Sequence, residues 1–291
     1  MAIEVKLSDD DDSITISFEP LEKLRMHEEV IEHSLEKLVA RIQRERVLKN
    51  PVIADSSSKT VIDGNHRVEA LRRLGAKYAP VQLVEYHSSS IVVERWFRAF
   101  AFNDLSSLKR ALRRVLKSWG IFEETSVEEA LKKLEQRSAS IAILTREQGF
   151  VVGKAVTKSL PAYRKAQLLE EELEALGGKK TYEMESVALE MLKGGVLVVA
   201  LPPITKEEVV EASTLGKLYP PKSTRHVVPL RVLGLNIPLE WLNIERKDLL
   251  LDKLRNHLQK GRFRKMPPRT KINGRLYTER VVIFEVNKEC L

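Results

Sequence analysis

The sequence has almost no cysteine, no long apolar run and no internal repeat. Cys290 is the only cysteine among the 291 residues, so no disulfide can form within the chain. The longest apolar runs, such as residues 196–201, are far below the roughly 20 residues that a membrane-spanning helix needs. No signal-peptide pattern is present. These absences predict a soluble, cytoplasmic protein that folds without disulfides and has no membrane partner.

The composition is that of an ordinary globular protein, with 43% hydrophobic and 31% charged residues. A chain of this length is enough for about two domains. The net charge of +8 is concentrated at one end, because residues 241–291 contain 13 basic and 6 acidic side chains. The first 240 residues are therefore nearly neutral and do not form a general basic surface for nucleic acid.

The pattern of apolar residues predicts alternating strands and helices. The expected strands are 13–18, 52–54, 60–62, 81–84, 140–144, 150–152 and 195–201, and the expected helices are 21–46 (a short turn and a longer helix), 66–74, 108–117, 127–136, 161–176 and 205–212. Long charged helices begin near residue 106, where we place a domain boundary. The predicted segments are an N-terminal domain (1–105), a second α+β domain (106–240) and a basic C-terminal extension (241–291).

Residues 60–67 form the most informative segment, a strand that passes through Asp63 and Gly64 into a helix. The first N–H groups of a helix and the positive end of its dipole attract an anion, and His66 and Arg67 add side-chain donors there. The combination favours a phosphate, and Asp63 could hold a metal ion that bridges phosphate oxygens. The alternative is structural, with Asp63 as the helix N-cap and Arg67 as a solvated residue.

A second polar cluster spans residues 219–226, Tyr-Pro-Pro-Lys-Ser-Thr-Arg-His. Two prolines stiffen a loop that presents Lys222, two hydroxyl groups, Arg225 and His226. An arginine can bind a carboxylate or a phosphate through two parallel hydrogen bonds, and hydroxyl groups can complete such a site. The alternative is an exposed polar turn.

Two further candidates have equally strong structural explanations. Glu28 lies in His27-Glu28-Glu29, at the expected start of a long helix, where the helix dipole favours carboxylates whatever their function. Trp96 begins an aromatic stretch that could line a pocket, although such clusters are more often core. The residues alone do not select either one.

From Asp63 to Arg67 the sequence resembles the ParB/sulfiredoxin-like superfamily, whose members carry a Gly-x-x-Arg signature between a strand and a helix. Sulfiredoxins need a cysteine inside that signature, where this chain has Asn65, so that branch is excluded. ParB-type partition proteins carry a Gly-Glu-Arg-Arg-like box followed by a helix-turn-helix module, and neither is evident.

The third branch, the free L-serine kinases of archaea and some bacteria, is similar to this chain over most of its length, with order and approximate spacing kept. The similar segments are 24–28, 61–67, 74–77, 96–100, 205–209 and 219–226. Two departures stand out. The family usually has a histidine where this chain has Asn65, and the basic tail beyond Trp241 is longer than in a typical member.

The resemblance implies a role for each matching residue. Glu28 would be the general base on the serine hydroxyl, and Asp63 would be catalytic or would position Mg²⁺, with His66 beside it. The nucleotide phosphates would be bound by Gly64, Asn65, His66 and Arg67, and the substrate by Trp96, Lys222, Ser223, Thr224, Arg225 and His226.

The resemblance therefore implies an α/β protein with a ParB-like N-terminal domain that binds nucleotide and phosphate, a second α+β domain and an active site in the cleft between them. The implied reaction transfers a phosphoryl group from ADP or ATP to free L-serine, with Mg²⁺, and gives O-phospho-L-serine for serine and cysteine metabolism. The alternative is a ParB-like, nucleotide-dependent DNA-binding or regulatory protein, supported by the basic tail. For the kinase, nucleic acid is not an expected partner, and deletion of the chain from Arg262 onward should spare catalysis.

Overall fold

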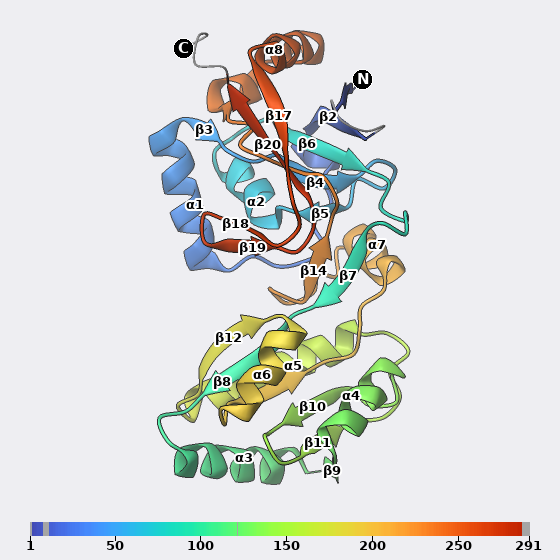
Figure 1. The fold of residues 1–291 in the computed structure, drawn as a ribbon, viewed down its shortest axis with the longest axis vertical. Helices are drawn as coiled ribbons and strands as arrows, with labels where there is room; N and C mark the ends of the chain where they lie inside the picture. Colours follow the sequence, from blue (N-terminus) through green and yellow to red (C-terminus); the bar gives the residue numbers. More distant parts are fainter. Residues whose placement is uncertain (1, 8–11, 121, 287–291) are drawn as a thin grey trace. The chain divides into compact units, whose positions relative to one another are not determined.

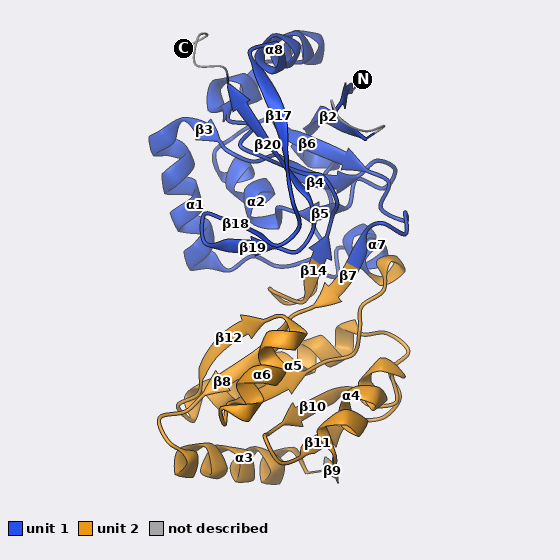
Figure 2. Cartoon of the chain, viewed as in Figure 1, with its two compact units in different colours: residues 1–92, 209–218, 226–291 blue, residues 93–208, 219–225 orange. Residues whose placement is uncertain are grey.

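The computed structural model describes residues 2–7, 12–120 and 122–286, and Cys290 lies outside them (Figure 1). The chain divides into two compact units (Figure 2). Unit 1 contains residues 1–92, 209–218 and 226–291, and unit 2 contains residues 93–208 and 219–225. The units are thus interleaved along the chain, whereas the sequence analysis expects the consecutive segments 1–105, 106–240 and 241–291.

Unit 1 begins with the elements that carry the Asp63–Arg67 motif. These are β1 (Ile3–Lys6), β2 (Ser13–Pro20), the 3₁₀ turn η1 (Leu21–Lys23), α1 (Glu32–Glu45), β3 (Val47–Leu48), β4 (Val52–Asp55), β5 (Val61–Asp63), α2 (Asn65–Arg73) and β6 (Tyr78–Val84). Apart from β3, these strands form a five-stranded sheet in the order β1-β2-β6-β4-β5. Only β4 and β6 run parallel; the other neighbours are antiparallel.

The C-terminal part of the chain completes unit 1. Its elements are β15 (Arg231–Leu233), β16 (Ile237–Pro238), the 3₁₀ helix η2 (Leu239–Asn243), α8 (Lys247–Gln259), β17 (Gly261–Met266), β18 (Thr270–Ile272), β19 (Arg275–Tyr277) and β20 (Val281–Val286). Strands β15, β20 and β17 form a second sheet in that order, and β18 and β19 form a hairpin.

One apolar core joins the two parts of unit 1. Ile16 and Phe18 of β2 belong to the same buried cluster as Leu254 of α8 and Val282 and Phe284 of β20. The basic tail is therefore part of the folded unit. This packing contradicts the expectation that the chain from Arg262 onward is dispensable, because that deletion removes two core strands.

Unit 2 is built on an antiparallel sheet. Its elements are β8 (Phe97–Ala101), α3 (Leu105–Trp119), β9 (Phe122–Thr125), α4 (Val127–Glu135), β10 (Ile141–Leu144), β11 (Gly149–Val152), α5 (Leu160–Ala175), β12 (Lys179–Glu183), α6 (Glu185–Lys193) and β13 (Leu197–Ala200). The sheet order is β12-β8-β13-β10-β11-β9. Apolar residues of α4 and α6, including Leu134 and Ala188, pack with Phe97 and Val198 of the sheet.

Three elements contain positions where the chain passes from one unit to the other. They are β7 (Val92–Arg95), α7 (Lys206–Leu215) and β14 (Thr224–Val227), of which β7 and β14 pair as a two-stranded sheet. The start of α7 is a capping box: Glu208 N–H donates to Thr205 Oγ1 (3.2 Å), and Thr205 N–H donates to Glu208 Oε2 (2.9 Å). The expected mixed α/β architecture is confirmed as well.

The burial of β20 generates a stability prediction. Phe284 is 3% exposed and packs against the rings of Phe263 and His257. Phe284→Ala should lower the free energy of unfolding by about 3–5 kcal/mol through lost burial and a residual cavity. Leu276→Ala, at a side chain that is 38% exposed, is the matched control and should change it by less than about 1 kcal/mol. Urea unfolding measures both, and equal small effects would mean that the tail is not part of the core.

Candidate functional site

The end of β5 and the start of α2 form a tight turn that only glycine fits. Gly64 is the N-cap of α2, with φ of 114° in the left-handed region. A Cβ atom at this position would lie 2.7 Å from Nε of Arg67, whose side chain folds back over the glycine. The motif therefore places an arginine directly over the amino end of a helix, where unpaired backbone N–H groups attract anions.

Two polar atoms at this helix end are buried without a partner. Asn65 is 9% exposed, and its Oδ1 has no hydrogen-bond partner in the described part of the chain; the same is true of Arg67 Nε. An unsatisfied buried polar atom costs free energy, and such atoms concentrate where a ligand completes the hydrogen bonds. The start of α2 therefore has the geometry of a ligand site: Arg67 Nε and the first backbone N–H groups of the helix can donate to an anion, and Asn65 Oδ1 can accept a hydrogen bond from a donor of the same ligand.

Asp63 binds arginine instead of capping α2. Its Oδ2 accepts a hydrogen bond from Arg231 Nη1 and lies 3.3 Å from Arg67 Nη2, and no side chain caps the helix. Removal from water opposes ionisation, but the guanidinium groups of Arg67, Arg231 and Arg275 outweigh it and hold the pKa of Asp63 well below its usual range. The interpretation of Asp63 as the helix N-cap is wrong. Its carboxylate stays ionised throughout the physiological pH range.

Arg231 connects Asp63 to two other parts of unit 1. The arginine is only 2% exposed. Its Nε donates to Glu279 Oε1 (3.2 Å), and its Nη2 donates to the main-chain oxygen of His226 (2.9 Å). A buried guanidinium is tolerated when carboxylates and carbonyl oxygens surround it in this way. The position of Asp63 therefore depends on residues far along the chain.

The described residues do not fit a resident metal ion at Asp63. No three His, Cys, Asp or Glu side chains converge anywhere in the described ranges. The Asp63 carboxylate is already in contact with two guanidinium groups, whose charge repels a divalent cation. The assignment of Mg²⁺ to Asp63 gains no support from this geometry.

Glu28 lies outside the long helix, contrary to the expectation. α1 begins at Glu32, so the helix dipole does not explain the carboxylate. Glu28 is 9% exposed, and its Oε1 lies 3.7 Å from Nε2 of His27. Nδ1 of His27 is 2.6 Å from the main-chain oxygen of Val61 in β5. His27 thus connects Glu28 to the strand that carries Asp63.

Two further histidines have defined positions in unit 1. Nε2 of His66 accepts a hydrogen bond from the backbone N–H of Ile31 (2.9 Å), so the imidazole orients the segment between Glu28 and α1. Nε2 of His226 is 2.8 Å from the hydroxyl oxygen of Tyr86, and its ring meets that of His27 edge-on at 5.3 Å. The catalytic role expected for His66 stays a prediction.

The loop of residues 219–225, whose last two residues begin β14, brings the predicted cations of unit 2 close to one aromatic ring. Nζ of Lys222 lies 5.6 Å, and the guanidinium carbon of Arg225 6.0 Å, from the centre of the Trp96 ring. Arg225 Nη1 also pairs with Glu94 Oε2 of β7. Lys222 has φ of 61°, a strained value for a residue other than glycine that is often found at functional sites. The interpretation of Trp96 as simply core does not account for these contacts.

Most of this loop is buried, which contradicts the alternative of an exposed polar turn. Ser223 is fully buried and donates to the main-chain oxygen of Pro220 (2.7 Å), while Thr224 and Arg225 are each 8% exposed. In unit 2 the structure thus groups Trp96 with residues 222–225, and in unit 1 it groups Glu28, residues 63–67 and His226.

Sequence reasoning missed Arg231, Glu279, Tyr86 and Glu94. A charged residue within the apolar stretch Val227–Leu235 was the available signal for Arg231. The sequence contains no signal for Glu279 and Glu94, because an isolated glutamate in a chain rich in charged residues is normally predicted to be an exposed surface residue. The phenol of Tyr86 could be paired with His226 only once the fold was known.

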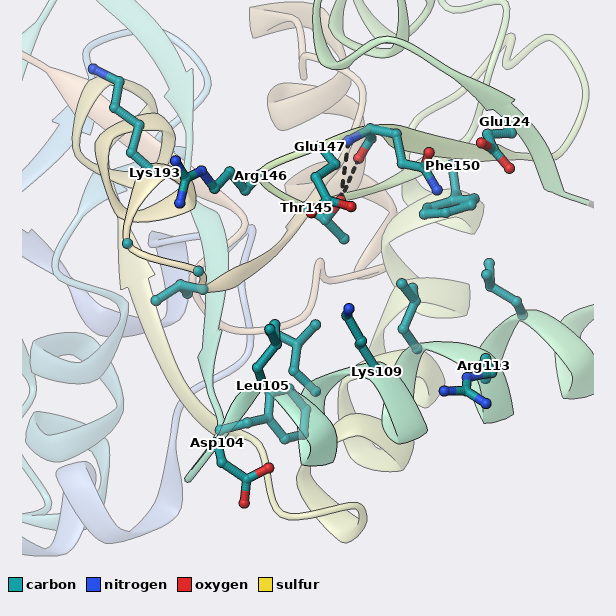
Figure 3. A pocket seen from close by; sticks show the side chains of 18 residues that line it. Asp104, Leu105, Lys109, Arg113, Glu124, Thr145, Arg146, Glu147, Phe150 and Lys193 are labelled. Carbon is teal, nitrogen blue, oxygen red and sulfur yellow. Dashed lines mark hydrogen bonds between the residues drawn. The ribbon is translucent and has the colours of Figure 1, made fainter.

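Unit 2 also contains a cavity away from these residues. Its volume is about 750 Å³, and Figure 3 shows Leu105, Lys109 and Arg113 on α3 opposite Thr145 and Phe150. The remaining lining residues lie in 102–124, 146–148 and 193–196, so no predicted site residue lines it.

Comparison with known proteins shows that this chain is similar to L-serine kinases. An ADP-dependent L-serine kinase of Thermococcus kodakarensis is 29% identical over 233 residues, which are 77% of this chain and 92% of that protein. An ATP-dependent L-serine kinase of Staphylothermus marinus is 26% identical over 76% of this chain and 89% of its own length. A ParB-like protein of Sulfolobus acidocaldarius is 24% identical over 75% of this chain and 94% of its own length. No protein-family model matches the chain.

Solved structures give the same result. A free serine kinase in complex with AMP superposes with a TM-score of 0.64 at 28% identity, covering 78% of this chain and 93% of that structure. A variant of a free serine kinase in complex with ADP gives a TM-score of 0.63 at 26% identity, over the same shares of the two chains. The resemblance to L-serine kinases inferred from the motifs is confirmed. Within the described ranges, no helix has both the length and the apolar character needed to cross a membrane.

The burial of His27 predicts a pH dependence of stability. Burial lowers the pKa of His27, opposed by the Glu28 carboxylate, so the unfolded chain binds this proton more readily than the folded one. When the pH falls from 7.5 to 5.5, the free energy of unfolding of the wild type should therefore decrease by up to about 1.4 kcal/mol. His27→Asn should not show this decrease. The exposed His33, changed to Asn, is the control and should follow the wild type. Equal pH dependence in all three proteins, measured by urea unfolding, would contradict the burial effect.

The arginine contacts of Asp63 predict the effect of removing its charge. Asp63→Asn leaves the buried Arg231 with one carboxylate fewer, which should lower the free energy of unfolding by about 1–3 kcal/mol. Asp252→Asn, in an exposed pair with Arg255, should change it by less than about 0.5 kcal/mol. Added Mg²⁺ should not alter the difference between Asp63→Asn and wild type; a difference that appears only with Mg²⁺ would restore the metal assignment.

Proposed function

We propose that this protein transfers the terminal phosphoryl group of ADP or ATP to the hydroxyl group of free L-serine and releases O-phospho-L-serine. The observation that carries the proposal is the position of Glu28, a buried carboxylate outside any helix and connected through His27 to the strand that leads into the anion-binding turn. The similarity to L-serine kinases over three quarters of the chain supports the same reaction.

Phosphoryl transfer does not require the protein to form covalent bonds with the reactants. It depends on how the protein positions the donor and the acceptor and stabilises the negative charge of the transferred group. In the proposed step the serine Oγ attacks the terminal phosphorus, and Glu28 accepts the hydroxyl proton. The new Oγ–P bond forms as the bond to the bridging oxygen breaks, and AMP leaves if the donor is ADP, or ADP if it is ATP. A carboxylate placed to accept the proton contributes about 10²–10⁴ in rate.

The start of α2 is proposed to bind the phosphates of the donor. Gly64 lets the main chain approach closely, and the N–H groups of Asn65, His66 and Arg67 point along the helix axis towards an anion. The Arg67 guanidinium adds charge and a buried Nε donor that no described residue uses. In this proposal the backbone role of Asn65 does not need the histidine usual in the family.

The loop of unit 2 is proposed to bind the serine and its phosphorylated product. Lys222 and Arg225 present positive charge for the carboxylate, and Trp96 holds both cations by its ring face. The Ser223 and Thr224 segment is buried, so its groups are preorganised. His226, which is hydrogen-bonded to Tyr86, would contribute to binding of the same substrate.

Mg²⁺ enters the proposal as the ion that accompanies nucleotide phosphates, with no residue of this chain assigned to it. The proposed reaction belongs in the cytoplasm, where nucleotide and free serine occur together, and its product would serve serine or cysteine metabolism.

The alternative, a ParB-like DNA-binding or regulatory protein, relied on the basic tail. In the structure several of these charges are neutralised: Arg264 pairs with Glu285 (2.6 Å), and Lys265 pairs with Asp12 (3.0 Å). A surface built to neutralise phosphates keeps its cations available. The tail therefore gives this alternative little support.

Incubation of the purified protein with L-serine, Mg²⁺ and either ADP or ATP tests the proposal. Formation of O-phosphoserine, followed by ³¹P spectroscopy, is the expected result, and the ratio of the two rates identifies the donor. L-alanine, which lacks the hydroxyl, is the control. Absence of phosphoserine with both nucleotides would overturn the proposal.

Removing the proposed base should abolish most activity without unfolding the protein. Glu28→Gln keeps the shape but cannot accept the proton, so turnover should fall by about 10²–10⁴. Glu29→Gln, the adjacent change, should retain activity within about twofold. Steady-state rates and far-UV circular dichroism measure the two effects, and a Glu28→Gln enzyme that works at the parent rate would exclude Glu28 as the base.

Arg225→Lys tests the substrate loop while preserving charge. A lysine cannot reproduce two parallel hydrogen bonds, so KM for serine should rise or turnover should fall, by about 1.5–3 kcal/mol in kcat/KM. Arg113→Lys on the exposed face of α3 is the control and should leave both parameters unchanged. Unaltered kinetics in Arg225→Lys would remove this arginine from the binding site.

A further inference from the structure

The cavity in unit 2 has an apolar wall formed by one side of α3. Leu105, Leu108, Leu112 and Leu116 all line it. Leu108 is 6% exposed, whereas Leu105 is 61% exposed and the other two leucines are half-buried. Phe150 lies opposite this wall (Figure 3). The described part of the chain thus leaves neighbouring apolar side chains uncovered, and apolar surface gathered in one place marks binding sites more often than scattered single residues do.

The size and shape of the cavity suit a small molecule. Its volume of about 750 Å³ lies within the range of about 300–1,000 Å³ that small-molecule sites occupy. A stable protein partner, by contrast, covers about 800 Å² of a broad surface on each side. One wall is α3, and residues 145–150 and 193–196 lie on the other side of the cavity (Figure 3). A compact ligand between the two walls contacts apolar side chains on both.

The lining also contains charged side chains of both signs. Its cations are Lys109, Arg113, Arg146 and Lys193. Its carboxylates are those of Asp104, Glu124 and Glu147. With all of these charges counted, the cavity has one more cation than carboxylates. The lining is therefore suited to a ligand with a single negative charge.

Two of the lining charges are already engaged within the protein. The Asp104 carboxylate caps α3 by accepting a hydrogen bond from the N–H of Ser107 (2.7 Å). Lys193 pairs with Glu190 (2.6 Å). Because one carboxylate and one cation are used in this way, the remaining lining charges still have one cation in excess.

The remaining cations have no partner among the described residues. The side chains of Lys109, Arg113 and Arg146 make no ion pair or hydrogen bond within the described ranges, and the same is true of Glu124 and Glu147. Figure 3 shows the Lys109 side chain extending from α3 towards Thr145 on the opposite wall. The ammonium group of Lys109 is thus available to a ligand in the cavity.

The helix itself adds to the positive charge on this side of the cavity. α3 contains no acidic residue, and Arg110, Arg114 and Lys117 lie on it beside the two lining cations. A carboxylate at the end of the helix, Glu172 of α5, accepts hydrogen bonds from Ser118 and Trp119 (2.9 Å each). The wall that carries the leucines is therefore also the more positive wall.

We propose that this cavity binds a small organic anion that has an apolar or aromatic body and one anionic group, such as a carboxylate or a sulfonate. The body packs against the leucines of α3 and Phe150. Lys109 donates to the anionic group, and Arg113 and Arg146 supply further positive charge. The site is separate from the proposed kinase reaction, because none of the residues assigned to that reaction lines the cavity.

Fluorescence titration of the full chain with two aromatic probes tests this site. Anilinonaphthalene sulfonate has an aromatic body and one sulfonate, and phenylnaphthylamine has the same body without the charge. ADP is present throughout to fill the proposed nucleotide site. The wild type should bind the sulfonate probe saturably at one site.

Two double variants separate the lining charges from the general charge of the helix. Lys109→Gln with Arg113→Gln should weaken binding of the sulfonate probe by about tenfold and change binding of the neutral probe by less than about twofold. Arg110→Gln with Arg114→Gln removes the same charges from neighbouring positions that do not line the cavity. This matched control should stay within about twofold of the wild type for both probes.

The apolar wall has its own variant. Leu105→Gln changes an exposed side chain of the lining and should weaken binding of both probes, because the aromatic body is common to them. Far-UV circular dichroism establishes that all variants are folded, since partly unfolded protein also binds such probes.

Several results would overturn the proposal. They are the absence of saturable binding to the wild type, an equal loss of sulfonate binding in the two double variants, and an equal loss of both probes in Lys109→Gln with Arg113→Gln. Self-association of the wild type that Leu105→Gln abolishes, measured by sedimentation equilibrium, would do so too, because the cavity would then be an interface between copies of the chain. None of these measurements depends on the formation of phosphoserine.

Discussion

The fold of unit 1 depends on one buried cation. Arg231 has almost no contact with solvent and directs its three nitrogens to Glu279, to Asp63 and to the main-chain oxygen of His226. Each of these groups would be costly to bury alone, and together they satisfy one another. The arrangement fixes the carboxylate at the end of β5 and, through its contact with Arg67, the side chain that covers the amino end of α2. The polar architecture of the anion-binding turn is therefore set by a residue that does not itself need to touch a ligand.

The parts of this site that could be predicted from the sequence are those in which neighbouring residues determine the conformation. The strand, the glycine and the helix from Thr60 to Arg67 form a local motif, so their conformation follows from neighbouring residues. The capping box at Thr205 is local in the same sense. The loop around Lys222 was recognisable because it contains many hydrogen-bond donors. The resemblance to serine kinases implied that these donors bind the substrate.

What sequence reasoning could not give are contacts between distant residues. Arg231 and Asp63 are 168 positions apart, and Tyr86 and His226 are 140 apart. No local sequence pattern identifies such pairs. Asp63 was therefore interpreted as a possible helix cap, and the basic tail was interpreted as an extension outside the two domains. Glu28 was the opposite case: the apolar pattern extended the long helix too far towards the N-terminus, and an incorrect boundary supplied a false explanation for a buried carboxylate.

The interleaving of the two units also has a consequence for synthesis on the ribosome. Residues 93–208 of unit 2 leave the ribosome as one continuous block, and its sheet pairs only strands within that block. Unit 1, by contrast, cannot close its core until Val282 and Phe284 emerge, and β16 must then pair with β3, which emerged long before. Non-local pairing of this kind is slow and leaves apolar surface exposed while it waits. The sheet of unit 2 can therefore form during synthesis while the core of unit 1 is still incomplete, and the apolar surface of unit 1 needs protection by chaperones during that interval.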